Sequence, residues 1–187
     1  ARTMEDKGNE AYQQLFAACA SVMELIVRNP RPVIAEVAGT ATAAGCQLVA
    51  SCDLAMASNT VKFATPGVNL GLFCSTPMVA LSRNVSRKHA MEMLLSGDMV
   101  DASRAEQIGL INRAFNPDQL TSETMAMALK IASKSTMTIA IGKRAFYEQA
   151  EMPLNEAYAY TSQVMTENML TRDAEEGIGA FLGKRTP

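Results

Sequence analysis

The 187-residue chain has no tryptophan, a single histidine and few other aromatic residues, four Tyr and six Phe. Its 17 Lys and Arg residues nearly balance its 19 Asp and Glu residues, so we expect no basic surface that follows a nucleic-acid backbone. No uninterrupted apolar run approaches the roughly 18 residues that a membrane-spanning helix needs. The sequence therefore predicts a globular protein whose partners are neither nucleic acids nor membranes.

Cysteine is also scarce, and the four cysteines are not spaced like the ligands of a cysteine-based metal site. The four residues Cys19, Cys46, Cys52 and Cys74 share no metal-ligand spacing, and no Cys-x-x-Cys motif occurs. Together with one histidine and no recognisable signal peptide, this predicts free, mostly buried thiols in a reducing compartment and no bound metal. The sequence does not decide whether this compartment is a bacterial cytoplasm or a mitochondrial matrix.

What the chain does have is apolar material, 48% of its residues, including 13 methionines. Flexible methionines fill irregular gaps, so we expect a methionine-packed helical core. Apolar periodicity and breaker residues predict helices and short strands. The predicted helices cover residues 9–28, 47–51, 87–95, 102–107, 118–134, 136–150, 154–170 and 173–183, and the predicted strands cover 33–37, 53–57, 62–64 and 110–115, with 68–76 irregular.

The pattern changes from mixed α/β to purely helical near residue 116. We therefore predict a first domain over residues 1–115 and a helical C-terminal region over residues 116–187. The chain starts at Ala1, and helical periodicity begins soon after it. We expect the N-terminal part of the fold to be missing from this chain.

The segment from residue 33 to residue 53 carries the clearest chemical signal. A strand ends at Gly39, and residues without bulk lead into a helix. The first amides of a helix have no acceptor within it, and the helix dipole adds positive charge there, so such a turn can bind an oxyanion. Small residues at a strand–helix junction also serve close packing alone. From the residues alone, both interpretations stay open.

Several stretches, in order, resemble the crotonase family, the enoyl-CoA hydratase/isomerase superfamily. They are RPVIAEVAG at residues 31–39, AAGCQL at 43–48, CDLAMA at 52–57, KFATP at 62–66, AMEMLLSGD at 90–98, AEQIGLI at 105–111, and Glu176, Gly177, Phe181, Lys184 and Arg185 near the end. The resemblance implies an α/β fold, a spiral of ββα turns followed by a helical C-terminal trimerisation region. The missing N-terminal part would carry the first strands, one oxyanion-hole amide and part of the adenine site.

The resemblance also implies a ligand, a coenzyme A thioester bound without any other cofactor. Family members hold the thioester oxygen with two backbone amides, and the second falls at Ala44 here. Ala43, Gly45, Pro66, Phe181 and Lys184 match family positions near the substrate, although Phe181 and Lys184 also fit a core residue and a solvated lysine. The expected assembly is a homotrimer or a dimer of trimers.

The resemblance is incomplete at the acid–base positions. Hydratases of the family carry one Glu where this chain has Gln47 and a second where it has Gly67. Neither residue can transfer a proton, so ordinary hydration is not expected. The sequence predicts an acyl-CoA-binding family member in fatty-acyl-CoA metabolism, or alternatively a non-catalytic acyl-CoA-binding or scaffold protein. Restoring both carboxylates is expected to introduce hydration if only proton chemistry is missing.

Other reactive side chains have simpler interpretations. A hydrolase using Cys74 or Ser75 needs a base, and the one histidine, His89, lies in a helical stretch. Glu36 is expected to pair with a Lys or Arg at a strand end, and Asp173 to cap a helix.

Overall fold

The computed structural model describes residues 8–186. These residues form two compact units, residues 8–29 with 33–127 and residues 30–32 with 128–186. The helices are α1 (Asn9–Arg28), α2 (Ala44–Ser51), α3 (Ser75–Asn84), α4 (Arg87–Ser96), α5 (Ala102–Gln107), α6 (Leu120–Ala132), α7 (Thr136–Gln149), α8 (Leu154–Met169), α9 (Arg172–Leu182) and the 3₁₀-helix η1 (Pro66–Leu70). The strands are β1 (Ile34–Val37), β2 (Ala41–Thr42), β3 (Leu54–Ser58), β4 (Lys62–Ala64), β5 (Val100–Asp101) and β6 (Arg113–Phe115).

The first unit contains two small sheets. One has the strand order β1-β3-β6 with parallel pairing throughout, and the other has the order β2-β4-β5. In the second sheet, β2 and β4 are parallel, and β4 pairs with β5 in the antiparallel sense. Parallel neighbours need a crossover between them, and α2 supplies the crossover from β2 towards the next strands.

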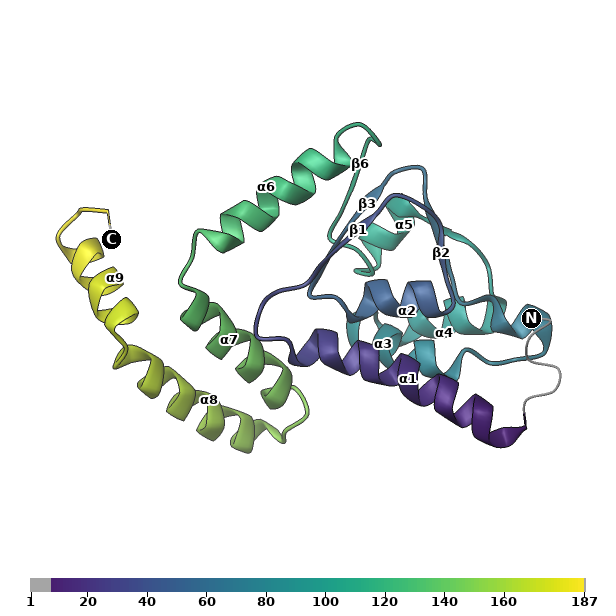
Figure 1. The fold of residues 1–187 in the computed structure, drawn as a ribbon, viewed down its shortest axis with the longest axis horizontal. Helices are drawn as coiled ribbons and strands as arrows, with labels where there is room; N and C mark the ends of the chain where they lie inside the picture. The colour runs from purple at the N-terminus through teal and green to yellow at the C-terminus, as the bar shows by residue number, and fades with distance from the viewer. Residues whose placement is uncertain (1–7, 187) are drawn as a thin grey trace. The chain divides into compact units, whose positions relative to one another are not determined.

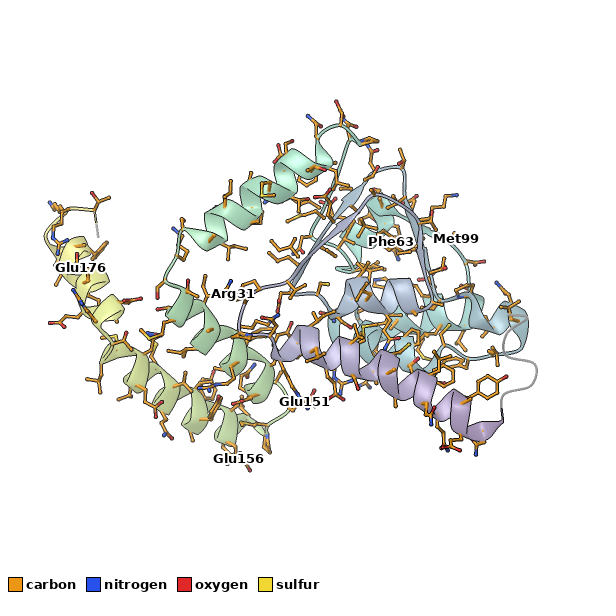
Figure 2. All side chains as sticks on the ribbon, in the orientation of Figure 1. Arg31, Phe63, Met99, Glu151, Glu156 and Glu176 are labelled. Atoms are coloured by element: carbon orange, nitrogen blue, oxygen red, sulfur yellow. The ribbon has the colours of Figure 1, made fainter. Side chains whose placement is uncertain are left out.

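Helix α2 is central to the first unit. It packs on α1, α3 and β2, and in Figure 1 α1 and the strands lie on opposite sides of it. Phe63 of β4 is fully buried in the interior of this unit (Figure 2). The Asn84 side chain donates to Ala50 O at 2.7 Å and to Ala80 O at 2.9 Å, which ties the ends of α2 and α3 together. The site described below is therefore built on a rigidly packed helix.

The core differs from the predicted methionine packing. Only two methionines, Met56 and Met93, are buried among the described residues, and six are exposed: Met91, Met99, Met125, Met137, Met165 and Met169. Alanines fill much of the interior instead, among them Ala57, Ala102 and Ala105. Small side chains let short elements approach closely, and this leaves little irregular space for methionine to fill.

The second unit is purely helical within its described residues. Helix α7 packs on α8, and α8 contacts α9. Lys143 Nζ donates to the carbonyl of Arg31 at 3.1 Å, and Arg185 binds both carboxylate oxygens of Glu176, at 2.5 and 3.1 Å. Among residues 8–186, no helix combines the length and the apolar character needed to cross a membrane.

Most predicted elements are present, but several boundaries were wrong. Residues 68–76 were predicted to be irregular, but η1 extends to Leu70, and Ser75 and Thr76 begin α3, which was not predicted. Pro77 lies in the first turn of α3, where its missing N–H costs nothing. Helix α2 begins at Ala44 rather than at residue 47, and residues 110–112 lie outside β6. The two-residue strands β2 and β5 were missed. The cap of α9 is Thr171 and not Asp173, which instead accepts a hydrogen bond from the hydroxyl of Ser135.

Candidate functional site

Two parallel strands end side by side and each leads into a helix. Thr42 of β2 pairs with Ala64 of β4. Two residues beyond β2 the chain enters α2, and two residues beyond β4 it enters η1 at Pro66. The sequence motifs AAGCQL and KFATP are therefore neighbours in space. This shared edge brings together the predicted positions at residues 43–47 and 66–67.

Ala43 connects β2 to α2 in a conformation that alanine rarely adopts. Its φ of 48° and ψ of −114° place it in the region that favours glycine. The Ala43 N–H donates to Ala64 O at 3.0 Å, and the Ala43 carbonyl accepts from Gln47 N at 2.9 Å. These bonds hold the strained turn between the strand pair and the helix.

Ala44 is the first residue of α2, and its amide is available to a ligand. The residue is exposed, and among the described residues its N–H has no protein acceptor. The helix dipole adds partial positive charge at this end. The Ala43 amide cannot serve in the same way, because it is already bonded to Ala64. The geometry therefore favours Ala44 N–H as the group that can hold an oxyanion.

Replacing Ala43 by glycine tests the strain in this turn. We expect Ala43→Gly to raise the free energy of unfolding by about 1 kcal/mol, because relief of the backbone strain exceeds the entropic cost of glycine. Ala50→Gly on the same helix is the matched control and is expected to lower it by about 1 kcal/mol. Urea denaturation of both variants measures the two changes. Equal losses of stability in the two variants would contradict strain at Ala43.

Gln47 lies in the second turn of α2 and is buried, with 4% of its surface exposed. Its Oε1 atom has no hydrogen-bond partner among the described residues. A buried acceptor without a partner is destabilising unless a group from outside the chain satisfies it. Side chains of a helix lean toward its N-terminus, so Gln47 leans back toward the turn at Ala44.

An apolar residue of similar shape should therefore be tolerated at position 47. We expect Gln47→Met to raise the free energy of unfolding by about 1–2 kcal/mol, since it removes an unpaired buried acceptor while filling the same space. Ser51→Ala is the matched control: it removes a satisfied bond, Ser51 Oγ to Gln47 O at 2.8 Å, and is expected to lose about 1 kcal/mol. A loss of stability in Gln47→Met would show that the carboxamide is satisfied in solution.

Gly67 lies in η1, where the family resemblance expects the second carboxylate. A Cβ added there would lie 2.7 Å from Leu72 O, 2.9 Å from Cys74 Sγ and 3.3 Å from Cys74 N. The Leu72 amide also donates to Gly67 O at 2.9 Å, which holds this segment against η1. No side chain fits at residue 67 unless residues 72–74 move. A carboxylate introduced at residue 67 would therefore have to displace this segment, and the expectation that two added carboxylates introduce hydration stays a prediction.

The two buried thiols near the site, Cys46 and Cys74, are unsuited to nucleophilic chemistry. Burial, and secondarily the nearby Cys74, raises the pKa of Cys46 to about 12, so its thiol stays protonated. Ser75 Oγ donates to Phe73 O, at 3.4 Å. His89 lies on α4 with its Nδ1 accepting from Arg104 at 3.2 Å. The Ser75 hydroxyl and the His89 imidazole are therefore not hydrogen-bonded to each other in the described residues.

The raised pKa of Cys46 predicts a pH dependence of stability. Below pH 9.0, its ordinary value, the thiol is protonated in both the folded and the unfolded chain. As the pH rises from 9.0 towards 12, the unfolded chain releases this proton and the folded chain keeps it, so stability falls. Thermal unfolding across this range should show a shallower decline for Cys46→Ala than for the original chain. Parallel profiles would contradict the shift.

The remaining predicted positions are placed as follows. Gly45 follows Ala44 in α2, and Pro66 is the first residue of η1. Phe181 and Lys184 lie in the second unit, at the end of α9 and just beyond it, and both are exposed. Their roles near a nucleotide stay predictions. Glu36 accepts a hydrogen bond from the Thr121 hydroxyl at 2.7 Å, where a Lys or Arg partner was expected.

Sequence reasoning missed Thr65, which stands between β4 and Pro66. Its side chain is 1% exposed, and its Oγ1 has no partner among the described residues. The position within the KFATP motif was the available signal. Within residues 8–186, no three His, Cys, Asp or Glu side chains come together as metal ligands.

Comparison with known proteins gives a consistent result. The family model described as enoyl-CoA hydratase/isomerase matches residues 2–187. Human enoyl-CoA hydratase domain-containing protein 3, mitochondrial, is 51% identical over 183 residues, which cover 98% of this chain and 60% of that protein. The chain thus spans about three fifths of the length of the curated relatives it matches.

Solved structures agree with the predicted fold. The crystal structure of enoyl-CoA hydratase from Mycobacterium smegmatis is 51% identical with a TM-score of 0.96, and the match covers 98% of this chain and 71% of that one. The crystal structure of human enoyl coenzyme A hydratase domain-containing protein 3 is 51% identical with a TM-score of 0.94, covering 98% and 72%. The predicted α/β crotonase fold is confirmed, and the chain belongs to the enoyl-CoA hydratase/isomerase family.

Proposed function

We propose that this protein binds an acyl-CoA thioester and stabilises negative charge on the thioester oxygen through the Ala44 amide, within fatty-acyl-CoA metabolism. The observation that carries the proposal is this amide: it belongs to an exposed residue, opens a helix and lacks an acceptor in the described residues, while the neighbouring Ala43 amide is occupied. A thioester oxygen is a suitable acceptor, since it gains negative charge when a proton leaves the α-carbon.

Hydration by a pair of glutamates does not belong to the proposal. Gln47 cannot act as a general acid or base. The space beside Gly67 is filled by the backbone of Leu72 and the Cys74 thiol. The closed surroundings of Gly67 favour the second candidate function, a protein that binds acyl-CoA without catalysis. The two candidates share the ligand and differ only in turnover.

The expected assembly is a homotrimer or a dimer of trimers built through the helical C-terminal region. Exposed apolar side chains in α7 and α8 support a contact there, including Phe146, Tyr158 and Met165. Sedimentation of the full-length protein tests the assembly, and a monomer at micromolar concentration would overturn it.

Crotonyl-CoA tests the ligand that the two candidate functions share and reports whether any hydration occurs. We expect it to bind the full-length protein in a calorimetric titration, with no loss of enoyl-thioester absorbance even at high protein concentration. Sustained loss of absorbance would favour an enzyme whose acid and base lie outside residues 47 and 67. Failure of crotonyl-CoA, butyryl-CoA and 3-hydroxybutyryl-CoA all to bind would overturn both candidates.

A further inference from the structure

His89 belongs to a cluster of three side chains on the surface of the first unit that takes no part in the candidate site. The His89 Nδ1 atom lies 3.2 Å from Arg104 Nη2 and 3.7 Å from Glu92 Oε2. Arg104 Nη2 in turn lies 3.8 Å from the same Glu92 oxygen. His89 and Glu92 stand on α4, whereas Arg104 stands on α5. The imidazole therefore joins two helices.

The donors and acceptors in this cluster fix the protonation state that the contact requires. A guanidinium group carries only donors and stays charged. The 3.2 Å contact is therefore a hydrogen bond only when His89 Nδ1 carries no proton and accepts from Arg104. A proton added at Nδ1 places a second cation against the guanidinium, and the new N–H can donate to Glu92, three residues further along the same helix. Protonation thus exchanges a contact between α4 and α5 for a contact within α4.

Glu92 and Arg104 are the only charged side chains that bond to the imidazole within the described residues. Helix α3 and η1 also pack against α4, and η1 contains no charged residue. The other charged side chains on the surrounding elements form no hydrogen bond or ion pair with His89 in that part of the chain: Arg83 on α3, Arg87 and Lys88 on α4, Asp101 at the cap of α5, and Glu106 on α5. The charge of the imidazole therefore acts on one cation and one anion.

The two helices that the cluster joins also hold the segment that leads into the candidate site. Strand β5, directly before α5, pairs with β4, and α5 itself contacts β4. At the end of α4, Gly97 O accepts from Asn69 Nδ2 of η1 at 3.5 Å. Strand β4 and η1 follow each other closely in the chain, and η1 carries Pro66 and Gly67. A change in the contact between α4 and α5 therefore acts on both elements that hold this segment.

We propose that His89, Arg104 and Glu92 form a pH-sensitive contact between α4 and α5. Neutral His89 accepts from Arg104 and ties the two helices together, whereas protonated His89 pairs with Glu92 and no longer holds Arg104. Histidine suits this exchange because its charge changes between about pH 5 and 8. Glu92 is exposed and then lies beside two cations, so it holds Arg104 only weakly, since exposed ion pairs contribute little.

A double-mutant cycle on the full-length protein tests this exchange. His89→Ala and Arg104→Met, singly and together, are compared by urea denaturation at about pH 8 and at about pH 5. At the higher pH, the two side chains should be coupled by about fivefold in the folding equilibrium constant, the size expected of one hydrogen bond. At the lower pH, the coupling should fall to one or below, because two cations then face each other.

Lys88→Met is the matched control for Arg104→Met, because Lys88 is an exposed cation beside His89 in the sequence. Its cycle with His89→Ala should give a coupling near one at both pH values. In a Glu92→Gln background, the coupling of His89 with Arg104 at the lower pH should fall further, since no anion offsets the two cations. A coupling of the same size at both pH values, or none at the higher pH, would overturn the proposal. Either result leaves the proposed function standing, because the cycle involves no ligand.

Discussion

Gly67→Ala is expected to lower the free energy of unfolding by about 1–3 kcal/mol. The added methyl group would lie 2.7 Å from Leu72 O and 2.9 Å from Cys74 Sγ. The thiol could rotate away, but the Leu72 carbonyl belongs to the backbone and is held by the Leu72 N to Gly67 O bond of 2.9 Å. Urea denaturation measures the loss.

Gly45→Ala is the control for this substitution. Its Cβ would meet only Ala41 Cβ at 3.8 Å, which is an ordinary contact. We therefore expect the free energy of unfolding to stay the same or to rise by up to about 1 kcal/mol. Cys74→Ala combined with Gly67→Ala should recover only part of the loss, because the contact with Leu72 O remains. Full stability of Gly67→Ala alone would show that residues 72–74 move freely, and a carboxylate at position 67 would then become feasible.

Ala44→Pro is expected to weaken acyl-CoA binding at least about tenfold, the loss typical of one hydrogen bond to a charge-bearing oxygen. Proline has no N–H, and the first helical position is the one where a helix tolerates it best. The change therefore removes the proposed ligand contact. Ala43 is not in the extended conformation that a residue before proline prefers, so the variant is informative only when α2 is shown to form. Calorimetric titration with butyryl-CoA measures the affinity, and circular dichroism checks the fold.

Thr136→Pro makes the same change at the first position of α7. Thr136 is exposed and follows the cap Ser135, whose φ of −55° and ψ of 118° are compatible with a following proline. We expect its affinity for butyryl-CoA to be unchanged. A folded Ala44→Pro protein with unchanged affinity would remove Ala44 from the site.

The helices and strands with strong patterns could be predicted from sequence. Helix α1 was predicted at its observed bounds because apolar residues recur every three or four positions and Pro30 follows its end. Strands β1 and β3 were predicted from short apolar runs. The two-residue strands β2 and β5 could not be predicted from the sequence, because their pairing with β4 arises only in the folded chain.

The site was predictable where motifs carry it and not where distant segments meet. Ala44 and Gln47 followed from the family resemblance, and the structure adds that one amide is available and one carboxamide oxygen is unpaired. The lack of space for a side chain at Gly67 depends on residues 72–74. No local sequence pattern predicts that these residues pack against Gly67. Thr65 stood out only after folding, because burial and missing partners are properties of the whole unit.

The most direct test of the account is the amide resonance of Ala44 in the full-length protein during titration with butyryl-CoA. The account predicts a downfield proton shift at Ala44 that follows the binding curve, with a smaller shift at Ala43, whose amide stays bonded to Ala64 O. Saturation of binding with the Ala44 resonance unmoved would contradict the claim that this amide holds the thioester oxygen.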